Sequence, residues 1–61
     1  MRFICTEDIT GKVLINLEKV SIIWKEDNSI KLDIDGQTSN LVYKTTKDRD
    51  DVFDHIESSC L

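Results

Sequence analysis

The chain lacks proline, holds only two glycines among its 61 residues and contains no long apolar run. Its longest apolar stretch spans a few residues, whereas a transmembrane helix needs about 20. The N-terminal residues soon turn acidic and lack the apolar core of a signal peptide. We therefore expect no membrane span and a single domain over residues 1–61, located in the cytoplasm.

Sequence motifs of catalytic and metal sites are also missing. The chain has one histidine and two cysteines, and it contains no paired-cysteine metal motif, phosphate-binding glycine loop or nucleophile elbow. Residues 33–36 are similar to the middle of a calcium loop. However, Lys31 and Val42 stand where that loop needs an acidic residue and a final glutamate. We expect no enzyme and no cofactor or metal.

Basic residues are scarce at the C-terminal end. The formal net charge is -4, and residues 46–61 contribute -3 of it through five acidic and two basic side chains. Binding to nucleic-acid phosphates requires Lys and Arg side chains that displace counterions. The charge distribution therefore argues against nucleic acid as a partner.

The composition that remains is typical of a soluble globular protein with a small core. Hydrophobic residues make up 39% of the chain and charged residues 33%. A chain this short buries only ~60% of its unfolded surface, so its core is marginal. Cys5 and Cys60 could close a large loop in an oxidising compartment. In the cytoplasm we expect both to be reduced thiols, either packed or loose.

The stretch from Val20 to Tyr43 predicts three antiparallel strands joined by two tight turns. Asp35-Gly36 favours a two-residue type I′ turn, which needs positive φ at both central residues. This turn pairs Ile30 with Leu41 and sets five side chains on the core face. They are Ile30, Leu32, Ile34, Leu41 and Tyr43.

The turn before Ile30 depends on loop length. A loop of two or four residues would set Lys25 opposite Ile30 and turn Trp24 away from the core. A three-residue loop over residues 26–28, with Asn28 left-handed, avoids this. It gives three apolar pairs: Trp24 with Ile30, Ile22 with Leu32, and Val20 with Ile34. We predict this loop, with Trp24 in the core.

Two shorter strands precede this sheet, over residues 2–6 and 12–17, with Gly11 in the turn between them. In the first, Phe3 and Cys5 share one face and Ile4 lies on the other. In the second, one face is apolar through Val13, Ile15 and Leu17. A short irregular turn over residues 16–19 is expected to lead into the central sheet.

A helix is predicted after Thr45-Thr46, whose hydroxyls suit an N-cap, with acidic residues in the first turns. Its apolar stripe recurs at helical spacing and should cover the core face of the sheet. The stripe consists of Val52, Phe53, Ile56 and Cys60. The expected fold class is α+β: a small antiparallel β-meander of four to five strands, followed by one C-terminal amphipathic helix packed on one sheet face.

One helix covers only one face of a sheet, so strand parity leaves a second face uncovered. We expect four apolar residues there: Ile4, Leu14, Ile23 and Val42. A contiguous apolar patch marks a contact surface, whereas scattered apolar residues on a surface are ordinary. The main hypothesis is a small non-enzymatic accessory module that binds a protein partner or forms a homo-oligomer through this face.

A second hypothesis uses the acidic side of the helix as a protein-contact surface. Its residues are Asp50, Asp51, Asp54 and Glu57. They could imitate the charge of DNA and so inhibit a nucleic-acid-binding protein. A solvated helix face is the ordinary interpretation of such a charge run.

A third hypothesis is a thiol or metal enzyme built on His55. Asp51 lies four residues earlier, so the two side chains are neighbours on a helix. Cys5 or Cys60 would then supply the nucleophile. No third ligand lies nearby in the sequence, and we favour an exposed helical histidine beside a carboxylate.

Several short segments together match a known pattern. They are Ile9-Thr10-Gly11-Lys12, Ile15-Asn16-Leu17, Ile22-Ile23, Ile30-Lys31-Leu32, Asp35-Gly36-Gln37 and Tyr43-Lys44-Thr45. With Val52 and Ile56 on a terminal helix, most of the chain resembles the small flagellar proteins of the FlbD type. Residues 26–29 depart from that family's Pro-Asp-Thr turn, and an acidic helix stands where the family commonly has a basic tail. The resemblance implies a non-enzymatic accessory protein that acts through protein contacts.

Overall fold

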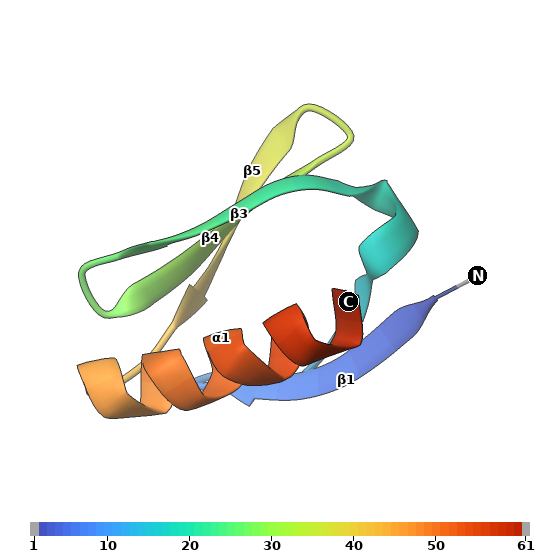
Figure 1. The fold of residues 1–61 in the computed structure, drawn as a ribbon. Coiled ribbons are helices and arrows are strands. Elements are labelled where there is room, and N and C mark those ends of the chain that lie inside the picture. The colour runs from blue at the N-terminus through green and yellow to red at the C-terminus, as the bar shows by residue number, and fades with distance from the viewer. Residues whose placement is uncertain (1, 61) are drawn as a thin grey trace.

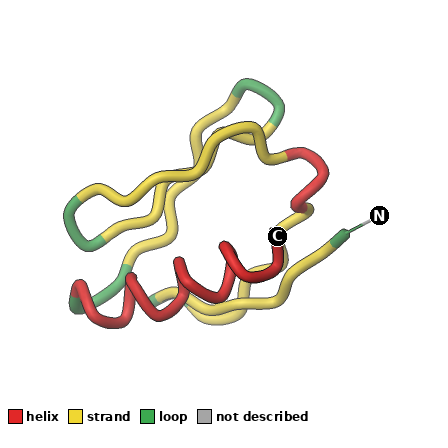
Figure 2. Tube along the Cα trace, viewed as in Figure 1, coloured by secondary structure: helices red, strands yellow, loops and turns green. Residues whose placement is uncertain are grey.

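The structure is a computed structural model that describes residues 2–60, of which Cys60 by its backbone alone. In this range, five strands, one 3₁₀ turn and one α-helix follow each other through short loops (Figures 1 and 2). They are β1 (Phe3–Asp8), β2 (Gly11–Asn16), η1 (Leu17–Lys19), β3 (Val20–Glu26), β4 (Ser29–Ile34), β5 (Gln37–Val42) and α1 (Thr46–Cys60). The predicted α+β meander with a C-terminal helix is confirmed. The helix that residues 2–60 contain is too short and polar to cross a membrane.

The strands form two antiparallel sheets, β1–β2 and β3–β4–β5. The turn η1 separates them, and the Asn16 side chain caps it by accepting a hydrogen bond from the Glu18 amide at 3.1 Å. The sheets meet at one corner, where the Ile9 amide donates to the Val42 carbonyl at 3.0 Å. α1 runs alongside β1, with the three-stranded sheet above them (Figure 1).

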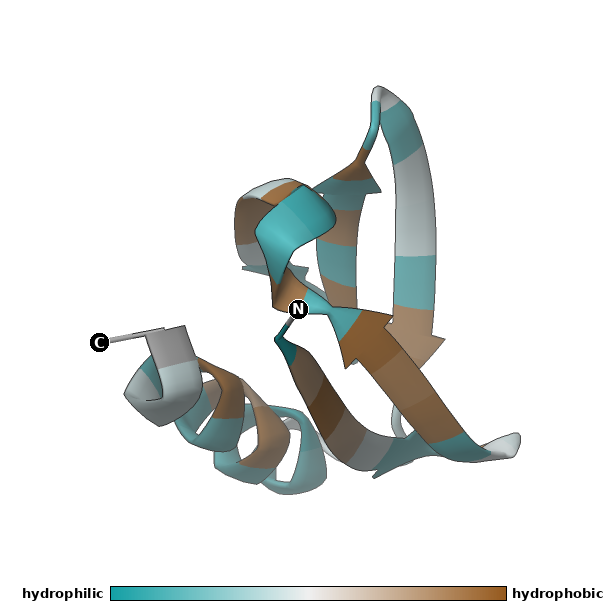
Figure 3. Cartoon of the chain, turned by 90° about the vertical axis from the view of Figure 1, so that its right-hand side faces the viewer, coloured by the Kyte–Doolittle hydropathy of each residue, from teal (hydrophilic) through white to brown (hydrophobic). Residues whose placement is uncertain are grey.

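Both sheets and the helix contribute to one core. Its buried apolar side chains are Ile4, Ile15, Ile30, Leu32, Leu41, Tyr43 and Ile56. Along β4, the middle strand of the three-stranded sheet, hydrophobic positions alternate with hydrophilic ones, as expected for a strand with one buried face (Figure 3). Burial of each Ile or Leu side chain stabilises the folded state by about 1.5–3 kcal/mol relative to an exposed side chain. These few residues therefore provide much of the stability of the fold.

The helix begins and packs as predicted. Thr45 is its N-cap, because its hydroxyl oxygen accepts a hydrogen bond from the Asp48 amide at 3.1 Å. Ile56 is 1% exposed, and Val52 and Phe53 pack against the core. The predicted stripe is confirmed at these three positions, while the Cys60 side chain lies outside the described residues.

The turn between β4 and β5 confirms the predicted register. Asp35 and Gly36 have φ values of 50° and 84°, so both central residues are left-handed as a type I′ turn requires. The observed pairs are Ile34 with Gln37, Leu32 with Ser39, and Ile30 with Leu41.

The turn between β3 and β4 corrects the prediction. The loop has two residues, Asp27 and Asn28, and the left-handed one is Asp27 at φ 53°. Lys25 therefore lies opposite Ile30, and Trp24 lies opposite Lys31 on the outer face of the sheet. The predicted core position of Trp24 is wrong. Of the three predicted apolar pairs, only Val20 with Ile34 occurs, because a bulge at Ser21 shifts the register.

The inward position of Lys25 has a physical explanation. Its ammonium nitrogen lies 3.3 Å from Asp50 Oδ1 and 5.1 Å from the centroid of the Phe53 ring. The aliphatic stem can thus cover apolar surface while the charge meets a carboxylate and an aromatic face. Arg49 also donates to the Asp27 carbonyl, which fastens this turn to the start of α1.

The first strand is turned over relative to the prediction. Ile4 and Thr6 are buried at 6% and 8% exposure, whereas Phe3 is 55% exposed. The pairing explains this result, because Ile4 lies directly opposite the buried Ile15 and both must share a face. The predicted core face of β2, with Val13, Ile15 and Leu17, is confirmed, as is the turn over residues 16–19.

Candidate functional site

The four apolar residues predicted to share an uncovered face do not form one surface. Ile4 is buried and Ile23 packs against the core. Leu14 and Val42 are 68% and 36% exposed, but they lie on different sheets. The predicted patch is therefore wrong as a single face, and Leu14 is its most exposed member.

A different apolar surface lies on the outer side of the first hairpin. The register of β1 and β2 places Cys5 directly opposite Leu14, with Phe3 two residues before Cys5 on the same side. Phe3 is more than half exposed, as is Leu14, and Cys5 is an exposed free thiol. These three residues are called the hairpin face below. Exposed apolar side chains gathered on one side of a sheet are typical of a contact surface.

Two opposite charges flank the hairpin face at its turn end. Glu7 lies directly opposite Lys12, and both side chains are exposed on the same side as Cys5. The surface thus combines an apolar centre with one acidic and one basic group in adjacent strands. A surface of this kind can match a copy of itself.

The outer side of the three-stranded sheet carries a second, interrupted apolar surface. Ile22 is 58% exposed and Trp24 is half-buried beside it on β3. Their partners on β4 are Asp33 and Lys31, so charged side chains lie next to both. This surface is therefore less continuous than the hairpin face.

The acidic side of α1 is partly neutralised by basic residues of the same chain. Asp50 Oδ1 lies 2.7 Å from Arg49 Nη2 and 3.3 Å from Lys25 Nζ. The hydrogen bonds from Arg49 and Lys25 lower the pKa of Asp50 below 3.8. Asp51 pairs with Lys47 at 3.1 Å. Of the predicted acidic contacts, Asp54 and Glu57 have no ion pair within residues 2–60.

The residues of the enzyme hypothesis stay dispersed. His55 is exposed on α1, one turn after the exposed Asp51, and Cys5 points outward from β1. The side chain of Cys60 lies outside the described residues. Among the side chains that the structure describes, no three His, Cys, Asp or Glu groups gather into a metal site.

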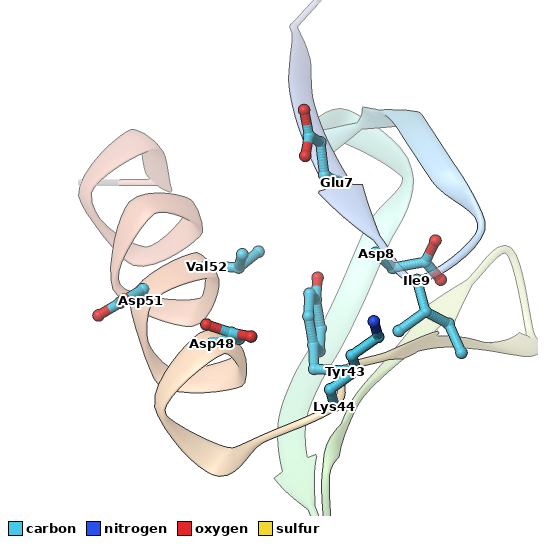
Figure 4. Close-up of a pocket in the computed structure, with 8 residues that line it drawn as sticks. All are labelled: Glu7, Asp8, Ile9, Tyr43, Lys44, Asp48, Asp51 and Val52. Carbon is cyan, nitrogen blue, oxygen red and sulfur yellow. The ribbon is translucent and has the colours of Figure 1, made fainter.

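A cleft of about 410 Å³ opens between the end of β1 and the start of α1 (Figure 4). It is called the Tyr43 cleft below, and its lining residues are Glu7, Asp8, Ile9, Tyr43, Lys44, Asp48, Asp51 and Val52. Tyr43 is only 6% exposed, and its hydroxyl is buried with no hydrogen-bond partner among the described residues. Burial, with a smaller contribution from the negative charge of Asp8, raises the pKa of Tyr43 to about 12.

Sequence reasoning missed this cleft, although it identified Tyr43 as a core residue. The acidic residues on its two walls are some 40 positions apart along the chain, at Glu7-Asp8 and at Asp48 and Asp51. Their proximity follows from the contact between the two sheets at Ile9 and Val42. Neither strand periodicity nor a local motif signals that contact.

Comparison of the chain with protein-family models, with curated proteins and with solved structures finds no match. The resemblance to FlbD-type proteins therefore stays a prediction.

Proposed function

We propose that the chain is a small non-enzymatic binding module that associates with a second copy of itself through the hairpin face. The observation that carries this proposal is the exposure of Phe3 and Leu14, at 55% and 68%, beside Cys5. Full burial of one such side chain is worth about 1.5–3 kcal/mol. Contact between two copies would recover part of that free energy.

Self-complementarity favours a second copy over an unrelated partner. A two-fold axis parallel to the strands, between β1 and β2, would set Cys5 of one copy over Leu14 of the second copy. The same axis would set Glu7 over Lys12 of the second copy. By symmetry each contact occurs twice: two contacts between Cys5 and Leu14 form the apolar centre, and two ion pairs between Glu7 and Lys12 lie beside it.

The size of the hairpin face predicts a weak dimer. Two strands of six residues make a face of roughly 20 by 10 Å. Stable interfaces bury about 800 Å² on each partner, which is considerably more. We therefore expect dimers that dissociate on dilution.

The test is the native mass, measured by light scattering under reducing conditions over about a hundredfold range of concentration. The proposal predicts a mass that rises from monomer to dimer. Leu14→Lys should keep the protein monomeric throughout, because it places a charge at the centre of the interface. Ile22→Lys is the matched control, since it charges an apolar position of similar exposure on the other sheet, 58% against 68% for Leu14, and it should still dimerise. A wild-type monomer at every concentration would contradict the proposal.

We also place the module in the cytoplasm and expect no nucleic-acid partner. The exposed free thiol of Cys5 suits a reducing compartment. The net charge of -4 repels phosphate backbones. A shift of the protein on native gels in the presence of DNA or RNA would contradict the second statement.

A further inference from the structure

We propose that the Tyr43 cleft binds an alkyl guanidinium group, as carried by an arginine side chain. This site shares only Glu7 with the proposed contact between copies, and its occupancy does not require self-association. Within residues 2–60, a hydroxyl without a hydrogen-bond partner lies at the floor of the cleft, and carboxylates without an ion pair belong to its lining.

The floor of the cleft is Tyr43. Its backbone is fixed by the hydrogen bond that its amide donates to the Asn28 carbonyl at 2.9 Å. The hydroxyl points into the space between α1 and β1 (Figure 4) and has no partner within residues 2–60. A buried hydroxyl without a partner is unfavourable, so a ligand that donates a hydrogen bond there gains affinity. The hydroxyl is covered from solvent, so a ligand must move part of the cleft lining aside to reach it.

Two of the four carboxylates in the cleft are already engaged. Asp8 Oδ1 accepts hydrogen bonds from the amide and the hydroxyl of Thr10 at 2.9 and 2.5 Å. Asp51 pairs with Lys47 at 3.1 Å. Glu7 on β1 and Asp48 on α1, in contrast, have no ion pair within the described chain. Glu7 belongs to β1 and Asp48 to α1, the two elements on either side of the cleft (Figure 4), so each adds negative charge to its lining.

The shape and lining of the cleft favour an organic cation over a metal ion. No three carboxylates converge on a metal position among the described residues. Val52, Ile9 and the ring of Tyr43 offer apolar surface for an aliphatic stem. A guanidinium carries five donors in a planar fork, which suits several acceptors spread over two walls and a floor. A volume of about 410 Å³ is enough for one such side chain.

Lys44 should weaken the binding of a guanidinium, so its removal is expected to raise the affinity. It is the one basic residue in the lining, against four acidic ones. Its ammonium competes with an incoming cation for the same carboxylates. Lys44→Gln should therefore tighten binding, whereas removal of an acidic wall residue should weaken it.

The probe is N-acetyl-arginine methylamide, titrated into isotope-labelled protein while the amide resonances of Val52 and Tyr43 are followed. The neutral isostere N-acetyl-citrulline methylamide is the control ligand. We expect saturable binding of the arginine probe that weakens as salt is raised, and no binding of the citrulline probe. Butylguanidinium distinguishes a small guanidinium compound from an arginine in a peptide. Equal affinity for both probes means that the cleft recognises the guanidinium group alone. Weaker binding of butylguanidinium means that the peptide groups of the arginine probe also contribute.

Three variants localise the interaction. Asp48→Asn should weaken the arginine probe about tenfold, because a charge-assisted hydrogen bond is lost. Asp54→Asn removes a carboxylate of the same helix outside the cleft and should leave the affinity unchanged. Tyr43→Phe should weaken binding while the fold stays intact, since it removes an oxygen without a partner in the protein.

The proposal is overturned if the citrulline probe binds as well as the arginine probe, or if Asp54→Asn weakens binding as much as Asp48→Asn. Unchanged affinity in Tyr43→Phe would also overturn it, because the hydroxyl would then have no part in recognition. At a concentration where the wild type is monomeric, Leu14→Lys should bind the probe like the wild type, because Glu7 then meets no Lys12 of a second copy. Absence of the dimer and absence of probe binding are therefore separate results.

Discussion

The two sheets of this molecule share a core but differ on their outer sides. The two-stranded sheet exposes Phe3, Cys5 and Leu14 on one side, with Cys5 directly opposite Leu14 and the uncharged Asn16 opposite Phe3. The three-stranded sheet exposes Ile22 and part of Trp24, each beside a charged residue of β4. The smaller sheet thus has the outer surface with fewer charged residues beside its exposed apolar side chains. Exposed charge interrupts apolar contact, so the difference favours the two-stranded sheet as the interface of the proposed self-association.

The largest predicted effect is a difference in stability between substitutions on the inner and outer faces of the smaller sheet. Ile4→Ala removes a side chain that is 6% exposed and should lower the free energy of unfolding by about 3 kcal/mol. Phe3→Ala, one residue earlier on the outer side, should cost less than about 1 kcal/mol in the monomer. Urea unfolding at low protein concentration measures both. A larger loss in Phe3→Ala would mean that the faces of β1 are assigned the wrong way round.

A second prediction compares the turns that close the two sheets. Gly11 has φ 122° and Gly36 has φ 84°, and a Cβ would meet no atom within 4 Å at either position. Any cost of alanine there comes from the backbone conformation alone. Gly36→Ala should cost about 1 kcal/mol, because alanine can relax into the left-handed region. Gly11→Ala should cost about 2 kcal/mol, because its φ lies further from that region. Equal losses in thermal or urea unfolding would contradict this ranking.

The smallest predicted effect lies where the two sheets meet. The hydroxyl of Thr10, with the amides of Thr10 and Val42, lowers the pKa of Asp8 below its ordinary value of 3.8. A carboxyl with a lowered folded-state pKa contributes stability above its unfolded pKa, and this contribution is lost as pH falls through the folded value. Asp8→Asn should therefore be less stable than the wild type at neutral pH, and the difference should shrink below about pH 4. A difference that stays constant with pH would exclude this linkage. Asp54→Asn is the control, since that exposed carboxyl accepts no hydrogen bond within residues 2–60.

The sequence determines the second half of the chain more fully than the first. In β4, apolar residues occupy only one parity, at Ile30, Leu32 and Ile34, and Asp35-Gly36 sets the register of the next strand. The core-facing residues of β4, β5 and α1 were predictable for that reason. In β3, apolar residues occupy both parities, at Ile22 and at Ile23, so the pattern alone leaves the face undecided.

The loop before β4 was predicted one residue too long because Lys25 was assumed to face water. The structure accommodates its charge through Asp50 and the Phe53 ring, which belong to a helix some 25 residues later. A long-range partner of this kind cannot be read from local alternation. The same holds for the hairpin face and the Tyr43 cleft, because both follow from which face of β1 is buried and how the sheets meet.

The central claim is that two copies meet through the hairpin face, and one measurement tests it directly. A concentrated sample is prepared from equal amounts of isotope-labelled and unlabelled protein, and only contacts between different copies are recorded by filtered nuclear Overhauser spectroscopy. We predict contacts from the Leu14 methyl groups of one copy to Cys5 and Phe3 of the second copy. Contacts between copies that involve Ile22 and Trp24 instead, or none from Leu14 in a sample that light scattering shows to be dimeric, would contradict the account.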